Sequence, residues 1–356
     1  MGRQAQRGKS GGKSGGAPGG TALRDAARLF KAGRARDAAL ACSRIVSSDP
    51  ENGPALHLLG AIRFSLGEAE AGLELIDQAI LRQDDDPSFH CNRANILNRL
   101  RRFDEAVESC DRALALKPDY PDVYANLCNA LRGLGRLEEA VAAARKAIAL
   151  RPGYIEAHNL LANALKAEGR IAEALPVFDR VIAAKPDNAS AHFNRALALL
   201  TAGRFEEGWR EYEWRWRGNE VRPRPFALPW WQGEALSNKG LLVWGEQGVG
   251  DEIMLGSLLA EVIAEAGRVV VECDRRLVGL FQRRFGAAHV VARQVPPQPG
   301  LEDGLDFQAP LGALCRWRRS AAADFADQPM QLDALPDRVA AAKERLAALG
   351  SGLKVG

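Results

Sequence analysis

The sequence lacks most of the features that mark secreted, membrane or metal-binding chains. Its six cysteines are scattered without a CxxC pair and its five histidines are not clustered, so neither a disulfide framework nor a zinc site is predicted. No stretch approaches the roughly 18 uninterrupted apolar residues of a membrane-spanning helix, and residues 1–20 hold no apolar core of a signal peptide. We therefore expect a cytoplasmic protein with no membrane span, no metal and no cofactor.

The chain also lacks the charge excess of a nucleic-acid-binding protein. Its formal net charge is +3 over 356 residues, and Arg3, Arg7, Lys9 and Lys13 supply four positive charges, which leaves −1 for the remainder. GKS occurs twice near the start, but neither copy has the glycine offset or the preceding strand of a phosphate-binding loop. Residues 1–20 are predicted to be a disordered basic tail.

A repeat of 34 residues is the strongest pattern that is present. Glycine followed by Arg or Glu recurs on this spacing from Gly33 to Gly203, and the one missing point carries Arg101-Arg102. Prolines recur at another phase, and small residues recur at two more: Ala26, Gly60, Ala94, Cys128, Ala162 and Ala196, then Ala38, Gly72, Ala106, Ala140, Ala174 and Gly208. Small residues let paired helices approach, glycine ends the first helix, and proline follows the second. Helix pairs should therefore begin near residues 19, 53, 87, 121, 155 and 189.

This pattern resembles the tetratricopeptide (TPR) repeat and covers about 200 residues. The resemblance implies six repeats over residues 21–217, coiled into an α-helical superhelix whose first helices line a concave groove. It also implies a protein or a peptide as the partner, although repeat architecture does not name the ligand.

Asparagines occupy two repeat positions that face the groove in TPR proteins. Position 6 carries Asn92, Asn126 and Asn194, and position 9 carries Asn95, Asn129 and Asn163. A primary amide both donates and accepts, so such a ladder can pair with the main chain of an extended peptide. The pattern is similar to the asparagine ladder of the O-linked N-acetylglucosamine transferases. Inter-repeat packing or helix ends are the alternative role. A carboxylate clamp is not favoured, because position 5 carries no lysine and position 2 carries Asp122 and Glu156.

Residues 204–234 hold five of the seven tryptophans. Trp209, Tyr212 and Trp216 fall on one stripe of a helix, which we expect to cap the repeat array and attach it to the next domain. Three prolines then predict an extended linker over residues 218–239.

Strand and helix patterns alternate beyond the linker. Strands are predicted at 241–244, 268–272, 289–291 and 305–309, with helices at 251–265 and 276–285 and a further helix through Trp317. This order predicts a small parallel α/β domain, Rossmann-like, over residues 240–335. Residues 336–356 predict one more helix and the first strand of a second lobe.

The stretch LLVWGEQGVGDEIML passes from strand to helix through Gly245, Gly248 and Gly250 and places Asp251 at the helix start. A carboxylate there is held ionised by free N–H groups and can accept a proton from a hydroxyl, although plain helix capping explains it equally well. Together with AGRVVVECDRRLVGLFQRRF, the stretch resembles the bacterial TPR-linked glycosyltransferases of the GT-B fold, and its turn is similar to that of the family 9 heptosyltransferases. The resemblance implies that Asp251 is the catalytic base on the acceptor side.

The expected function is therefore that of a peptide-binding TPR protein that carries the N-terminal, acceptor-side half of a GT-B glycosyltransferase. The lobe that binds a nucleotide sugar is missing, so sugar transfer and a nucleotide-sugar partner are expected only where that lobe is present. The alternative is a non-catalytic TPR scaffold for protein–protein interaction.

Overall fold

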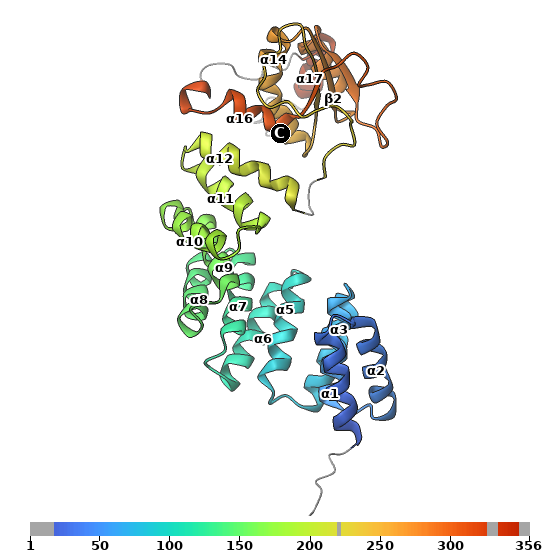
Figure 1. Cartoon of the computed structure of the whole chain (residues 1–356), viewed down its shortest axis with the longest axis vertical. Coiled ribbons are helices and arrows are strands. Elements are labelled where there is room, and N and C mark those ends of the chain that lie inside the picture. Colours follow the sequence, from blue (N-terminus) through green and yellow to red (C-terminus); the bar gives the residue numbers. More distant parts are fainter. Residues whose placement is uncertain (1–17, 219–221, 326–333, 349–356) are drawn as a thin grey trace, which may run out of the picture. The chain divides into compact units, whose positions relative to one another are not determined.

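The computed structural model describes residues 18–218, 222–325 and 334–348 (Figure 1). The chain divides into two compact units, Met1–Ala184 and Lys185–Gly356. The predicted tail up to residue 17 and the predicted strand at 352–356 lie outside the described residues. Within those ranges, no helix has both the length and the apolar character needed to cross a membrane.

The first unit is built from helices that pack in consecutive pairs (Figure 1). The first members of the pairs are α1 (Pro18–Lys31), α3 (Gly53–Ser65), α5 (Pro87–Arg99), α7 (Pro121–Gly133) and α9 (Ile155–Ala167). The second members are α2 (Ala35–Ser48), α4 (Ala69–Arg82), α6 (Phe103–Leu116), α8 (Leu137–Leu150) and α10 (Ile171–Ala184). The helix starts predicted at 53, 87, 121 and 155 are confirmed to the residue.

Glycine ends the first helix of a pair because the turn that follows needs a positive φ. Gly33, Gly67, Gly135 and Gly169 have φ of 77°, 91°, 75° and 81°. Arg101 takes the same place between α5 and α6 with φ of 61°. A left-handed conformation costs a residue with a side chain roughly 1–2 kcal/mol, so this arginine is held there against a local preference.

The small residues that recur at two positions of the 34-residue repeat are all buried. Gly60 and Gly72 show why their size matters, since a Cβ on Gly60 would lie 2.8 Å from the Gly72 carbonyl oxygen and 2.7 Å from Cγ1 of Ile76. The close approach of α3 and α4 therefore depends on glycine at this crossing.

The second unit begins with the last helix pair, α11 (Ala189–Thr201) and α12 (Phe205–Tyr212), and a 3₁₀ turn, η1 (Glu213–Arg217). Four parallel strands follow in the order β3-β2-β1-β4: β1 (Gly240–Trp244), β2 (Arg268–Cys273), β3 (His289–Ala292) and β4 (Phe307–Pro310). The connecting helices are α13 (Val249–Leu255), α14 (Leu259–Glu265), α15 (Val278–Arg284) and α16 (Cys315–Arg318), and α17 (Pro336–Ala348) comes last. The helix predicted over 251–265 is thus divided, because a 3₁₀ turn at Gly256–Leu258 separates α13 from α14.

The predicted linker pairs with the sheet. The amide of Trp231 donates to the Gln308 carbonyl oxygen at 2.8 Å, and the Gln308 amide donates to the Pro229 carbonyl oxygen at 2.9 Å. Trp231 and Leu236 are buried, so this segment is part of the core of the second unit.

The tryptophan stripe joins the last helix pair to the sheet within this unit. The Trp209 indole N–H donates to the Arg319 carbonyl oxygen at 2.9 Å. Trp216 meets Trp230 and Trp244 edge to face, with ring centroids 5.3 and 5.6 Å apart. Aromatic pairs of this geometry add about 0.5–1.5 kcal/mol each beyond their buried area.

Candidate functional site

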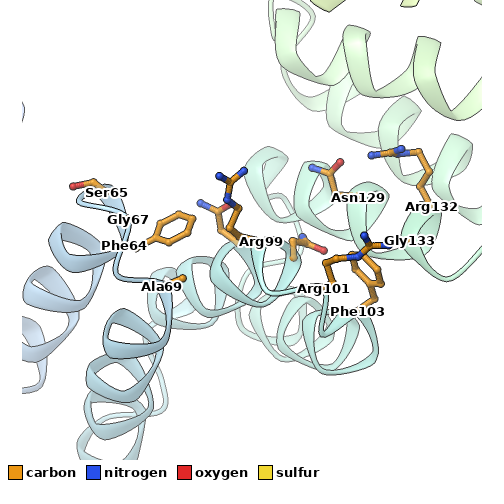
Figure 2. A pocket seen from close by; sticks show the side chains of 12 residues that line it. Phe64, Ser65, Gly67, Ala69, Arg99, Arg101, Phe103, Asn129, Arg132 and Gly133 are labelled. Carbon is orange, nitrogen blue, oxygen red and sulfur yellow. The ribbon is translucent and has the colours of Figure 1, made fainter. Parts of the chain in front are cut away.

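A cavity of about 930 Å³ opens in the first unit where the first helices of three successive pairs end. Its lining comes from the C-terminal parts of α3, α5 and α7, the turns after α3 and α5, and the first residues of α4 and α6: Phe64, Ser65, Gly67, Ala69, Asn95, Asn98, Arg99, Arg101, Phe103, Asn129, Arg132 and Gly133 (Figure 2). Helices α3 and α5 pack against each other, as do α5 and α7, so the cavity is a product of repeat stacking.

The position 9 asparagines of two repeats line this cavity. Asn95 is exposed on α5 and Asn129 is half-buried on α7. Asn98, one turn beyond Asn95, donates from Nδ2 to the Asn126 carbonyl oxygen at 2.9 Å, while its buried Oδ1 has no hydrogen-bond partner in the described structure. The side-chain amides of Asn95 and Asn129 form no hydrogen bond with any described residue and line this concave surface.

Two of the three position 6 asparagines, Asn92 and Asn126, contact the preceding repeat. Nδ2 of Asn92 lies 2.8 Å from Nε2 of His57, and Nδ2 of Asn126 donates to the Cys91 carbonyl oxygen at 3.1 Å. Burial lowers the pKa of His57, which favours the neutral ring whose Nε2 accepts this bond. These two amides thus take part in packing between repeats, which is the alternative to peptide binding for the asparagine ladder.

The other two asparagines of the predicted ladder lie elsewhere. Asn163 is half-buried on α9 and is outside the lining of this cavity. Asn194 lies on α11 in the second unit, where its Nδ2 donates to the Ser190 carbonyl oxygen at 2.9 Å. The structure therefore brings Asn95 and Asn129 together at one cavity and does not place Asn163 or Asn194 there.

Three arginines that sequence reasoning missed share the cavity. Arg99 is in the last turn of α5, Arg101 is in the following turn, and Arg132 is in the last turn of α7; all three are exposed (Figure 2). Burial lowers the pKa of the neighbouring Lys166, and the charge of Arg132 lowers it further. In the sequence only Arg101 stands out as a candidate site residue, because it replaces the glycine that the other repeats carry. Arg99 and Arg132 do not belong to any of the positions that recur every 34 residues.

The three glycines of the turn in the second unit have different surroundings. Gly245 is buried, and a Cβ on it would lie 2.3 Å from Oε1 of Glu252, so packing explains that glycine. Gly248 precedes α13, and its amide donates to Oδ2 of Asp251 at 3.2 Å. Gly250 faces open space. Asp251 is half-exposed and closes its own helix start by this bond, which is one half of a capping box.

Glu246, whose buried side chain precedes Asp251 in the sequence, fixes the turn. The Glu246 carboxylate accepts from the guanidinium of Arg215 at 3.1 Å and from the Gly312 amide at 3.1 Å, and the side chains of Glu246 and Arg215 are each 1% exposed. Burial raises the pKa of Glu246, and Arg215 opposes that rise. The guanidinium of Arg215 also lies over the rings of Tyr212 and Trp216 at 4.3 Å. The glycine turn is therefore anchored to η1, the 3₁₀ turn that follows the last helix pair.

No group of three or more His, Cys, Asp or Glu side chains could hold a metal ion in the parts of the chain that are described. All six cysteines are buried and free of disulfides, and burial raises the pKa of each thiol. They act as small apolar side chains, as expected from their spacing.

Comparison with known proteins identifies the repeats. Residues 57–121 and 159–212 match one tetratricopeptide repeat model, and residues 97–164 match a second. Protein FlbA of Caulobacter vibrioides is 33% identical over 165 residues, which cover 42% of this chain. The chain spans only 28% of the length of FlbA.

Two solved structures share the helical array. PilW, described as a widely conserved type IV pilus biogenesis factor, is similar with a TM-score of 0.51 at 21% identity, over 56% of this chain and 93% of that one. The APC/C hetero-tetramer Cut9–Hcn1 gives a TM-score of 0.52 at 14% identity, over 56% of this chain and 40% of that one. At these identities the likeness establishes the fold alone. TPR repeats are confirmed over residues 57–212, and the matched residues of both repeat models end before the sheet.

Proposed function

We propose that this TPR chain is a protein–protein interaction scaffold that binds an extended segment of a partner in the groove of its first unit. The observation that carries the proposal is the placement of Asn95 and Asn129 on the wall of one cavity of about 930 Å³. Binding pockets in proteins commonly enclose about 300–1,000 Å³ and place a few polar groups on a concave wall.

Equivalent positions on successive repeats make these amides suited to a main chain. Asn95 and Asn129 are 34 residues apart and occupy the same place on α5 and α7. An extended peptide offers an N–H and a C=O at every residue, and an amide side chain can satisfy both. Recognition of the main chain is largely independent of peptide sequence, which fits a scaffold that holds a segment of a larger protein.

The test compares two sets of asparagine variants. The double variant Asn95→Ala with Asn129→Ala removes two cavity amides that form no hydrogen bond with any described residue. Peptide affinity should therefore fall by about tenfold or more with little change in stability. The matched control is Asn126→Ala, which removes the bond to the Cys91 carbonyl oxygen and should lower stability by about 1 kcal/mol while affinity changes little. Equal affinity of the wild-type chain and the double variant in fluorescence polarisation would remove the basis of the proposal.

A second candidate function is acceptor activation in a glycosyltransferase, with Asp251 as the base. It is favoured by the parallel four-stranded sheet and by the half-exposed Asp251, which follows β1 and whose side chain is bonded only to its own turn in the described structure. Ligands of open α/β sheets bind beyond the carboxyl ends of the strands, near the point where the strand order reverses, and β1 and β4 meet at such a point here.

Asp251→Asn tests this second function. The asparagine can still accept the Gly248 amide bond, so the fold should be retained. In a chain whose reading frame includes a nucleotide-sugar lobe, loss of the base should reduce sugar transfer by roughly 100-fold or more. Transfer at the normal rate would leave Asp251 as a capping residue.

A further inference from the structure

Three arginine side chains place positive charge on the cavity wall. Arg99, Arg101 and Arg132 all line it, and none of its twelve lining residues is acidic. Among the residues that the structure describes, none of the three forms an ion pair or a side-chain hydrogen bond. A guanidinium presents several N–H donors in a fixed plane, so three unpaired ones on a concave wall form a ready site for anions.

Arginines at the start of three second helices of the array are paired. The arginine that starts the second helix of a pair bonds the glutamate three residues later: Arg102 to Glu105 at 2.6 Å, Arg136 to Glu139 at 2.7 Å, and Arg170 to Glu173 at 2.7 Å. These pairs lie on an exposed surface and contribute little to stability. These arginines are neutralised by a neighbouring glutamate, whereas the three cavity arginines have no such partner among the described residues.

The backbone at Arg101 adds an independent observation. The corresponding turn position is glycine in every other repeat, with φ between 74° and 91°, and only this repeat places a side chain there, with φ of 61°. That side chain reaches the cavity wall (Figure 2). Residues held in sparsely populated conformations cluster at sites of function.

We propose that this cavity binds a carboxylate-rich segment of an extended peptide, with the three arginines holding its Asp or Glu side chains and the cavity asparagines holding its main chain. The inference rests on the proposed peptide-binding function and adds the chemical class of the partner. Arginine pairs with carboxylates through two parallel hydrogen bonds, which are stronger than neutral ones. The site differs from a carboxylate clamp at repeat positions 2 and 5, where this chain has Asp122 and Glu156 and no lysine.

A peptide fits the cavity better than a nucleic acid does. Single-stranded nucleic acids bind by stacking their bases on open aromatic rings in a basic groove. The two aromatic residues here, Phe64 and Phe103, are half-buried, and the Phe103 ring lies so close to Gly133 that a Cβ there would be 2.6 Å from it. The asparagine amides, in contrast, match the repeating groups of a peptide main chain.

The experiment selects short random-sequence peptides on phage with the full chain and then measures one enriched peptide by fluorescence polarisation. We expect an excess of Asp and Glu in the selected pool, affinity that falls with added salt, and a loss of about tenfold for Arg99→Gln with Arg132→Gln. Arg101→Gly should weaken binding by about fivefold. Arg112→Gln is the matched control, since Arg112 is exposed on α6, outside the cavity, and pairs with Asp84.

The outcomes separate this inference from the proposed function. Selected peptides that need Asn95 and Asn129 but show no acidic excess would overturn the acidic partner and leave the peptide-binding groove. Failure to enrich any peptide would overturn both. A single-stranded RNA oligomer that displaces the selected peptide at lower concentrations than an acidic competitor would show that the arginines serve a nucleic acid, and would refute the inference.

Discussion

Arg101→Gly should make the protein more stable and a weaker binder at the same time. The arginine lies at φ 61°, where the other turns of the array carry glycine. It forms no ion pair or side-chain hydrogen bond with any described residue, so its removal takes away no bond of that kind. The substitution therefore relieves a backbone cost and removes a charge from the cavity wall.

The size of the gain follows from two opposing contributions. A side chain in the left-handed region costs roughly 1–2 kcal/mol, and glycine in exchange loses about 0.4–1 kcal/mol through the greater freedom of its unfolded chain. The midpoints of these two ranges differ by about 0.8 kcal/mol, which is the expected stabilisation. In a unit of this size, 1 kcal/mol shifts the melting temperature by roughly 2–4 °C, so a rise of about 1–4 °C is expected.

Calorimetry of the full chain measures the melting temperature of the variant, and fluorescence polarisation measures its peptide affinity. Gly135→Arg, which places an arginine in the equivalent turn of the next repeat, is the reciprocal variant and should lower the melting temperature by a similar amount. A lower melting temperature for Arg101→Gly would refute the reasoning, since Arg101 would then stabilise the fold. A higher melting temperature with unchanged affinity would refute only its role in binding.

Three other predictions concern the framework. Burial lowers the pKa of His57, so the unfolded chain binds a proton more readily than the folded one, and stability should fall as the pH drops below about 6.5. Urea midpoints at two pH values measure this change, and His57→Gln should reduce the difference between the two midpoints. Gly60→Ala should lower stability by about 1–3 kcal/mol, because its Cβ would meet the backbone of α4, and an unchanged urea midpoint would contradict that contact. Arg215→Met should cost about 3–5 kcal/mol by leaving Glu246 buried without its partner, and adding Glu246→Met should restore most of the loss in a double-mutant cycle.

The sequence by itself determined the repeat array and the strands. Helix starts at 53, 87, 121, 155 and 189 follow from the 34-residue spacing of glycines and small residues, and those small residues are buried. The four strands of the sheet also lie within two residues of their predicted bounds. These features depend on local preferences, such as a turn that needs positive φ or an apolar run between turns, which a chain carries wherever it folds.

Only the tertiary structure decided what each polar side chain does. Asn92 and Asn95 occupy one helix and looked alike in the sequence, yet the first contacts His57 of the preceding repeat and the second lines the cavity. Arg99, Arg101 and Arg132 belong to no single phase of the repeat, and Arg215 and Glu246 are 31 residues apart. A side chain can form a hydrogen bond only with a group that lies within about 3 Å of it. Which groups these are depends on how helices and strands from distant parts of the chain stack against each other.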